Sequence, residues 1–354
     1  MQINLLANPL LIWYDKEKRD LPFRENKDPY QIWISEVMLQ QTKVSTVIPY
    51  FKKWINYYPD IKTVAKANLT DLLKIWEGLG YYGRCRNFYK AAIIVCNRYN
   101  GKIPNNWELF CALPGVGEYT AAAVLSIAYN RDYPVLDGNV KRVMFRILGL
   151  KKISPTNINK IKKNLQNIIP EKNPGDFNQG MMELGALICI PMTPKCLECP
   201  VSSFCKAFKN GNPSLYPNKI KRKKTPHYDY TSGIIWKEKY FLIQKRKENV
   251  MLGGLWELPN FKNPNINRIK DFFKNSIKES LEFEIKILNT VCSVKHKYSH
   301  FSITMSCFNC ELKEEKINSK KEYKWILPRD IELYPFSKVN HKVFKHLNKD
   351  IINV

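Results

Sequence analysis

Four of the ten cysteines in this 354-residue chain have the spacing of a metal site. They lie within 17 residues, with six, two and five residues between successive members: Cys189, Cys196, Cys199 and Cys205. The Cys-x-x-Cys turn directs two sulfurs at one centre, as zinc sites and iron–sulfur clusters both require. Zinc sites usually join two similar pairs across a longer spacer, whereas here one pair is flanked by single cysteines. The spacing favours an iron–sulfur cluster and leaves zinc as the alternative.

Glu36 is a candidate general acid. It is embedded in the apolar run Ile-Trp-Ile-Ser-Glu-Val-Met-Leu, and an apolar environment raises the pKa of a carboxyl group so that it stays protonated. The alternative is a glutamate on the solvated face of an amphipathic helix. Asp28 and Pro29 stand where a helix carrying this run would begin.

Asp137 is a candidate partner for that acid. It precedes Gly138 and a periodic apolar segment, so we expect it to cap a helix. A carboxylate that faces helix amides is kept ionised and can stabilise a positive charge that develops in a reaction. One acid and one carboxylate form the pair that cleaves glycosidic bonds.

The segment Leu113-Pro-Gly-Val-Gly-Glu-Tyr-Thr120 has the pattern of a helix-hairpin-helix. Gly115 and Gly117 permit a tight turn, and the amides that open the second helix then face a phosphate. Such a hairpin contacts the DNA backbone independently of base sequence. An ordinary turn between two helices is the alternative.

The charge of the chain favours a polyanionic partner. The formal net charge is +25 and the sequence pI is about 9.5, which modestly favours nucleic acid. The six other cysteines are scattered, as is usual in a reducing compartment. We expect neither a signal peptide nor a membrane span, because the N-terminus lacks a basic region and its apolar residues are interrupted. These features predict a cytoplasmic protein.

The pattern along the chain predicts two domains joined by a linker. Residues 1–205 are expected to form an all-α domain, residues 206–228 a basic linker, and residues 229–354 an α+β domain. Within the last of these, strands are expected near 240–243 and 301–307, and a helix near 266–281. The basic run at 219–224 is either a strap that contacts phosphates or a solvated linker.

Several motifs together resemble one protein family. They are Ser35-Glu-Val-Met-Leu-Gln-Gln-Thr42, Gly78-Leu-Gly-Tyr-Tyr-Gly83, the hairpin, Val135-Leu-Asp-Gly-Asn-Val140 and the four cysteines. In this order they resemble the adenine DNA glycosylase (MutY) family of the helix-hairpin-helix glycosylases, from about Asp28 to the C-terminal region. The resemblance implies excision of adenine paired with 8-oxoguanine or guanine in double-stranded DNA. It also implies one structural 4Fe-4S cluster on the four cysteines.

The resemblance also implies roles for residues that match the family motifs. Glu36 matches the acid that protonates adenine N7, and Asp137 matches the carboxylate that stabilises or captures the sugar cation. Asn139 and Tyr119 match supporting positions in the active site. A lysine stands in place of Tyr119 in endonuclease III-like enzymes that also cut the strand. We therefore expect a monofunctional enzyme that leaves an abasic site, although Lys141 lies close to Asp137 in sequence.

Four further residues match positions that contact DNA. Gln179 matches a residue of the adenine pocket, and Arg24 lies at the other wall of that pocket. Gln41 and Tyr81 match side chains that wedge into the duplex beside the damaged pair. Wedging offsets the cost, a few kcal/mol, of rotating the base out of the stack.

The C-terminal domain resembles the Nudix-related domain of the same family. Leu252-Gly-Gly-Leu-Trp-Glu-Leu-Pro259 carries this likeness, whereas residues 266–284 lack the Arg- and Glu-rich helix that holds magnesium. The domain is expected to recognise 8-oxoguanine and not to hydrolyse a nucleotide. Tyr298, Ser299 and His300 match the Phe-Ser-His loop beside the oxidised base, with an ordinary hairpin tip as the alternative.

Two other functions compete with this interpretation. An endonuclease III-like pyrimidine glycosylase is disfavoured by Tyr119 and by the C-terminal domain. A non-catalytic cluster protein that scans DNA would not need a buried Glu36. We expect the protein to act as a monomer.

Overall fold

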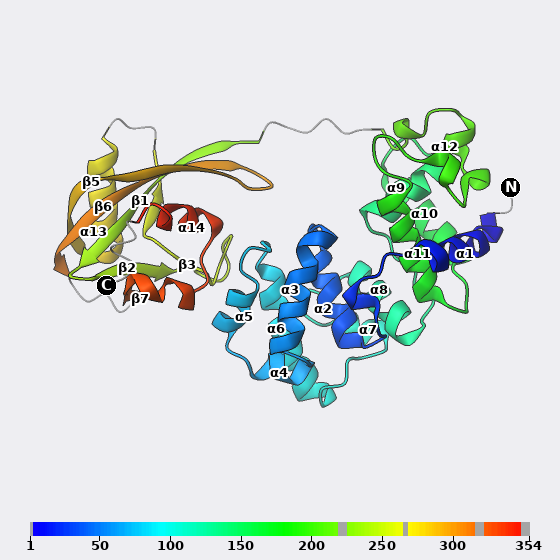
Figure 1. Cartoon of the computed structure of the whole chain (residues 1–354), viewed down its shortest axis with the longest axis horizontal. Coiled ribbons are helices and arrows are strands. Elements are labelled where there is room, and N and C mark those ends of the chain that lie inside the picture. Colours follow the sequence, from blue (N-terminus) through cyan, green and yellow to red (C-terminus); the bar gives the residue numbers. More distant parts are fainter. Residues whose placement is uncertain (1–2, 219–224, 265–267, 316–321, 348–354) are drawn as a thin grey trace. The chain divides into compact units, whose positions relative to one another are not determined.

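A computed structural model describes the chain except residues 1–2, 219–224, 265–267, 316–321 and 348–354 (Figure 1). It consists of two compact units. Unit 1 comprises Met1–Lys66 and Asn87–Lys221, and unit 2 comprises Ala67–Arg86 and Arg222–Val354. The basic run expected at 219–224 lies outside the described residues, and the domain boundaries expected at 205 and 229 stay a prediction.

Unit 1 is helical, as the sequence predicts. Its α-helices are α1 (Ala7–Glu17), α2 (Pro29–Leu39), α3 (Val44–Tyr57), α4 (Ile61–Lys66), α7 (Trp107–Cys111), α8 (Glu118–Tyr129), α9 (Gly138–Ile147), α10 (Pro155–Ile168), α11 (Pro174–Leu187) and α12 (Lys206–Lys209). Helix α5 (Leu69–Ile75) belongs to unit 2, and α6 (Gly83–Tyr99) begins in unit 2 and continues in unit 1. None of the helices in the described residues combines the length and apolar composition needed to cross a membrane.

Short 3₁₀ turns complete unit 1. They are η1 (Ile3–Leu5), η2 (Pro22–Arg24), η3 (Cys196–Glu198), η4 (Ser202–Phe204) and η5 (Pro213–Leu215). Two of these turns lie in the four-cysteine segment. The expected linker contains α12 and η5, and Tyr216 from it packs in a small apolar cluster with Cys205 and Ala207.

Several apolar clusters hold the helices of unit 1. One joins α1, α9, α10 and α11 through residues such as Leu10, Val143, Leu165 and Met181. In another region, the buried Trp33 of α2 packs edge-on against Phe88 and Phe110, with ring centroids 4.8 and 5.0 Å apart. Burying such rings is the main stabilising contribution of these contacts, each ring removing roughly 150–250 Å² from water.

Local chemistry sets where the key helices begin. Asp28 caps α2 by accepting a hydrogen bond from the amide of Tyr30 at 2.8 Å, with Pro29 in the first turn. Asp137 caps α9 as predicted, because its Oδ1 accepts from the amide of Val140 at 2.6 Å. Gly117 precedes α8, so three predicted helix starts are confirmed.

Unit 2 is built on a seven-stranded mixed sheet, which confirms the α+β class. Its strands are β1 (His227–Lys237), β2 (Tyr240–Lys245), β3 (Trp256–Glu257), β4 (Asn260–Lys262), β5 (Phe283–Lys297), β6 (Ser302–Glu315) and β7 (Tyr323–Ile326). The order is β3-β2-β1-β6-β5, with β4 beside β1 and β7 beside β2. β1 and β6 pair in parallel, and the other pairs are antiparallel.

Helices cover both faces of this sheet (Figure 1). Alternate residues of β2 point to opposite faces, so Phe241 and Ile243 pack with α14 (Lys338–Phe344), whereas Leu242 packs with α13 (Ile269–Leu281). A 3₁₀ turn, η6 (Pro328–Leu333), precedes α14. The strands expected near 240–243 and 301–307 and the helix expected near 266–281 are confirmed as β2, β6 and α13.

Candidate active site

Glu36 is buried in the middle of α2, with only 6% of the residue exposed. Burial is the main reason that the pKa of its carboxyl is raised to about 7. A hydrogen bond from Tyr119 and the charge of Arg24 lower this pKa, whereas the charge of Asp137 raises it. A large share of the molecules therefore holds a proton on Glu36 at neutral pH, as a general acid must.

Asp137 lies at the start of α9 with one carboxylate oxygen bound to a helix amide. Its side chain is partly buried, and its charge acts on Glu36. The fold thus brings together the two carboxyl groups that the sequence singled out 101 positions apart.

Tyr119 lies in the first turn of α8, directly after the hairpin. Its hydroxyl donates a hydrogen bond of 2.5 Å to Oε2 of Glu36 and lies 3.6 Å from the sulfur of Met182. Burial and the charge of Glu36 hold the pKa of the phenol well above its usual value, so it remains protonated. No amine occupies this position, and the hydroxyl can orient Glu36.

Glu183 is a second buried carboxyl group that sequence reasoning missed. It is 1% exposed, and it receives hydrogen bonds from Arg19 at 2.6 and 2.9 Å and from Arg24 at 2.8 Å. Burial raises its pKa, but the hydrogen bonds and charges of both arginines outweigh burial and hold it at about 2. Its position in the apolar run Gly-Met-Met-Glu-Leu-Gly was the available signal, the same one that marked Glu36.

Gln179 lies on the same helix as Glu183, and Asn139 lies on α9 where that helix approaches α11. Gln179 is partly buried on α11, four residues before Glu183 and therefore on the same face of the helix. Asn139 accepts a hydrogen bond from Arg142 at 3.1 Å. A Cβ at Gly185 would lie 2.7 Å from Cβ of Asn139, so glycine is needed for α11 to approach α9 this closely.

The hairpin presents its glycines on the surface. Gly115 has a φ of +78°, and a Cβ there would lie 2.7 Å from Cβ of Asn87. Gly117 is exposed at the start of α8, and no atom lies within 4 Å of a Cβ built on it. Helix amides at this end are therefore accessible to an anion.

Two of the predicted DNA contacts have strained backbones. Gln41 in unit 1 has a φ of 56°, and Tyr81 in unit 2 has a φ of 50°. Both side chains are exposed. A left-handed backbone costs a residue other than glycine roughly 1–3 kcal/mol, and such strain is concentrated at functional sites.

The four cysteines of the loop surround one small cavity together with Arg146. Arg146 is only 2% exposed, and its guanidinium donates to the sulfur of Cys189 at 3.2 Å and to the carbonyls of Cys189, Ile190 and Pro191. In the described part of the chain, no three His, Cys, Asp or Glu side chains are grouped so that they could hold a metal ion.

The tip of the β5–β6 hairpin carries Tyr298, Ser299 and His300. The amide of Tyr298 donates to the carbonyl of Phe301 at 2.8 Å, which closes the turn. The hydroxyl of Ser299 lies 2.6 Å from the hydroxyl of Tyr81, also in unit 2, and His300 is exposed. Burial raises the pKa of Tyr298 to about 12. The fold therefore brings Tyr81 and Ser299 into direct contact.

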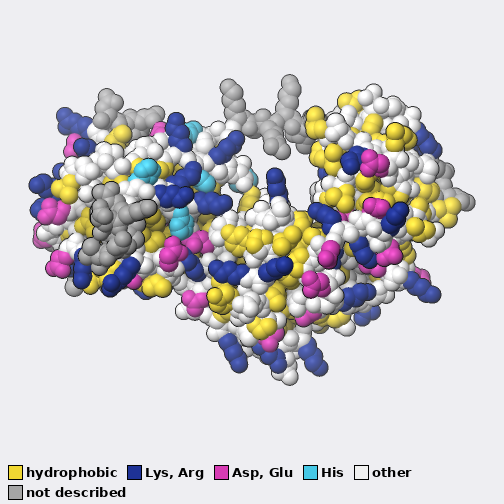
Figure 2. All heavy atoms as spheres, viewed as in Figure 1, with side chains coloured by type: hydrophobic (Ala, Val, Ile, Leu, Met, Phe, Trp, Pro, Cys, Tyr) yellow, Lys and Arg dark blue, Asp and Glu magenta, His cyan; other side chains and the backbone are white. Residues whose placement is uncertain are grey.

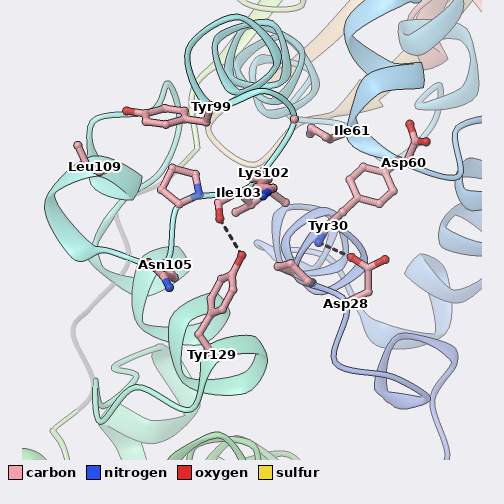
Figure 3. Close-up of a pocket in the computed structure, with 13 residues that line it drawn as sticks. Asp28, Tyr30, Asp60, Ile61, Tyr99, Lys102, Ile103, Asn105, Leu109 and Tyr129 are labelled. Atoms are coloured by element: carbon pink, nitrogen blue, oxygen red, sulfur yellow. Dashed lines mark hydrogen bonds between the residues drawn. The ribbon is translucent and has the colours of Figure 1, made fainter.

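A separate cavity of about 640 Å³ lies at the N-terminal end of α2 (Figure 3). Two of its polar groups are engaged in the fold, since Asp28 caps α2 and the hydroxyl of Tyr129 donates to the carbonyl of Ile103 at 2.7 Å. None of the predicted site residues lines it. It is not the candidate active site.

Comparisons with known proteins agree with this arrangement. The model of the HhH-GPD superfamily base excision DNA repair proteins matches residues 34–171, and that of the NUDIX domain matches residues 231–346. The adenine DNA glycosylase of Buchnera aphidicola subsp. Acyrthosiphon pisum is 41% identical over 302 residues, or 84% of each chain. The chain belongs to the adenine DNA glycosylase family. The chain is thus a hydrolase that cleaves the N-glycosidic bond of adenine in DNA.

More distant relatives match a smaller share of this chain. The adenine DNA glycosylase of Mus musculus is 35% identical over 313 residues, which cover 73% of this chain and 61% of the mouse protein. The structure of a thermostable thymine-DNA glycosylase is similar with a TM-score of 0.55 and 29% identity, covering 59% of this chain and 97% of that chain. The resemblance seen in the sequence motifs is confirmed, and so is the order of the helical and Nudix-like folds.

Proposed function

We propose that the enzyme excises adenine paired with 8-oxoguanine or guanine in duplex DNA and leaves an abasic site. The observation that carries this proposal is the buried Glu36, hydrogen-bonded to Tyr119 and close enough to Asp137 to feel its charge. A protonated acid and an ionised carboxylate on one site suit the cleavage of a glycosidic bond.

In the proposed reaction, Glu36 donates its proton to N7 of an adenine that has been rotated out of the duplex. The bond between C1′ and N9 then breaks, its electrons leave with the base, and positive charge develops on the sugar. Asp137 stabilises this cation or captures it covalently. Water adds at C1′ to give the abasic sugar, and its proton returns to Glu36. Tyr119 orients the acid, and Asn139 supports the site.

The enzyme is proposed to be monofunctional. Strand cleavage by a glycosylase needs an amine that forms a Schiff base with C1′, and the phenol of Tyr119 cannot supply one. Lys141 and Tyr119 line the same cavity of about 560 Å³. Lys141 is therefore the amine that could occasionally form a covalent bond with the sugar.

Arg24 and Gln179 are proposed as walls of the adenine pocket. Glu183 already accepts hydrogen bonds from both arginines, so we assign it the task of holding Arg24 in place. An arginine held by a buried carboxylate keeps one orientation, which favours selective contact with a base.

The strained Gln41 and Tyr81 are proposed to enter the duplex beside the mispair, and the amides at Gly115 and Gly117 to contact its backbone. The left-handed φ angles of Gln41 and Tyr81 support this assignment. A backbone that stores strain to present a side chain is costly, and the cost is consistent with a role in binding.

Cys189, Cys196, Cys199 and Cys205 are proposed to hold one 4Fe-4S cluster. The chemistry of the donors fits, because four thiols line one cavity and a buried arginine donates to one of the sulfurs, although the described side chains are not grouped as a metal site. Cysteine thiolates are the usual ligands of such clusters. When bound, the cluster would stabilise the loop; excision needs no electron transfer. Its neighbours Lys195 and Lys206 are then proposed to contact phosphates.

Tyr298, Ser299 and His300 are proposed to recognise 8-oxoguanine. The hydroxyl of Ser299 is exposed at a hairpin tip and can hydrogen-bond the altered edge of the base. We further propose that the protein is a cytoplasmic, nucleoid-associated monomer.

The test is single-turnover cleavage of a duplex with adenine opposite 8-oxoguanine, compared with adenine opposite guanine and with thymine glycol. We expect release of free adenine, fastest opposite 8-oxoguanine, with no strand break until alkali or heat is applied. Preferential release of thymine glycol, or a strand break at the rate of base release, would contradict the proposal.

A further inference from the structure

A cavity of about 500 Å³ in unit 2 is lined by positively charged side chains and by no negatively charged ones among the described residues. It is bounded by the glycine-rich segment 78–83, the turn at 250–252 and the hairpin tip. Its basic lining side chains are Arg86, His296, Lys297, His300 and Lys338, and no aspartate or glutamate is among the described residues that line it. On the visible face of unit 2, histidines lie among lysine and arginine side chains (Figure 2).

Several lysines elsewhere in unit 2 are paired with carboxylates. Lys237 lies 2.6 Å from Glu315, and Lys278 lies 2.6 Å from Glu284. Among the described residues, by contrast, neither Lys297 nor Lys338 forms an ion pair with a carboxylate. Uncompensated positive charge around a concave surface raises the local concentration of anions.

The groups around His296 also favour an anion. The ring of His296 packs edge-on against Tyr298 at 4.5 Å, and the charged groups that face it are Lys338 and Lys342 of α14. Lys342 is held there by a 2.6 Å hydrogen bond to the carbonyl of Lys295. Burial and these two lysines lower the pKa of His296, so an arriving negative charge would favour its protonation.

We propose that this cavity binds a backbone phosphate of the DNA strand that carries the recognised guanine. The inference rests on the proposed function, because it assumes that Ser299, which lines the cavity, recognises that guanine. A phosphate of the same strand then comes within reach of Lys338 and His296. Phosphate contacts of this kind fix the register of a protein on DNA and carry no base information themselves.

The first experiment measures how binding depends on salt. The probe is a duplex with a non-hydrolysable adenine analogue opposite 8-oxoguanine, and affinity is followed by fluorescence anisotropy over a range of NaCl concentrations. The logarithm of the association constant falls linearly with the logarithm of the salt concentration, and the loss of one phosphate contact makes this slope shallower by about 0.9. We expect this loss for Lys338→Gln and restoration of the slope by Lys338→Arg.

Lys239→Gln is the matched control, since Lys239 is an exposed lysine in the turn between β1 and β2. Relative to the wild type, its salt dependence should change less than that of Lys338→Gln. Equal slopes for the two variants would overturn the inference. Thermal unfolding of each variant verifies that the fold is retained.

The second experiment measures proton uptake. Calorimetric binding enthalpies in buffers of different ionisation enthalpy, near pH 7, should reveal uptake by the wild type and its loss in His296→Gln. His346→Gln, at an exposed histidine outside the cavity, should behave as the wild type. Undiminished uptake by His296→Gln would contradict the assignment of the proton to this ring.

These results are distinguishable from failure of the proposed function. Absence of adenine release by the wild type would overturn the proposed function, whatever the slopes. Normal release and normal preference for 8-oxoguanine, together with equal slopes for Lys338→Gln and Lys239→Gln, would overturn the phosphate site alone.

Discussion

Glu36 of α2 and Glu183 of α11 are both almost completely buried, with 6% and 1% of the residue exposed. Their pKa values nevertheless move in opposite directions, to about 7 and about 2. Glu36 has a neutral phenol as its hydrogen-bond donor, whereas Glu183 has two guanidinium groups. The comparison teaches that burial alone does not decide the charge of a carboxyl group. The charge of its partners decides whether it serves as an acid or as a fixed anion.

The largest expected effect comes from removing the acidic proton of Glu36. In Glu36→Gln the amide cannot protonate adenine, so the single-turnover rate of adenine release should fall by about 10²–10⁴-fold. Binding to the adenine:8-oxoguanine duplex should remain. Adenine release at the wild-type rate would show that another group is the acid.

Removing the charge of Glu183 should mainly reduce stability. Glu183→Gln leaves two partly buried arginines without a counter-charge, and the free energy of unfolding should fall by about 3 kcal/mol. Urea denaturation measures this value.

The matched control is Glu118→Gln. Lys162 and Glu118 are also 2.6 Å apart, but their side chains are 47% and 72% exposed. Exposed pairs contribute about 0–1 kcal/mol, so this variant should lose little. Equal losses in Glu183→Gln and Glu118→Gln would contradict a structural role for the buried ion pair.

The pH dependence of the rate sharpens the role of Glu36. Adenine release needs the protonated acid, so the rate should fall as pH rises through about 7. The hydrogen bond from Tyr119 lowers the pKa of Glu36, and Tyr119→Phe should therefore move this decline to higher pH. A profile that moves to lower pH in Tyr119→Phe would contradict this coupling.

The effect of pH on stability is expected to be smaller than that on the rate, and to have opposite signs for the two glutamates. The folded pKa of Glu36 is raised, so its contribution is complete below pH 4.5 and is lost as pH rises through about 7. The folded pKa of Glu183 is lowered, so its contribution is present above pH 4.5 and is lost as pH falls through about 2. Each contribution is of the order of 3 kcal/mol.

Unfolding free energies from pH 3 to pH 8 test this opposition. Glu36→Gln should remove the loss of stability on the alkaline side, and Glu183→Gln should remove a loss on the acid side. If either variant changed the opposite side instead, the assigned protonation states would be wrong.

Sequence reasoning succeeded where the signal is local. The burial of Glu36 follows from the apolar residues on both sides of it, and the helix cap at Asp137 follows from the residues after it. The apolar run at 240–243 located β2, and alternating apolar residues located β6; these signals need no knowledge of distant contacts. The roles assigned to the site residues remain proposals.

Other features depend on contacts between distant segments. Glu183 meets Arg19 across 164 positions, and Tyr81 meets Ser299 across 218. The residues around each of these side chains give no indication of which distant residue it contacts. For the same reason, the grouping of residues 67–86 with the C-terminal unit was not foreseen.

The sequence by itself thus determined the fold class and the candidate acid and carboxylate, because periodicity, capping and apolar context act over a few neighbouring residues. Only the tertiary structure decided which buried glutamate carries a proton and which is held as an anion. It also decided that five basic side chains surround one cavity with no carboxylate among its described lining residues. The physical reason is that electrostatic interactions depend on distance in space and on burial, and both are properties of the folded chain.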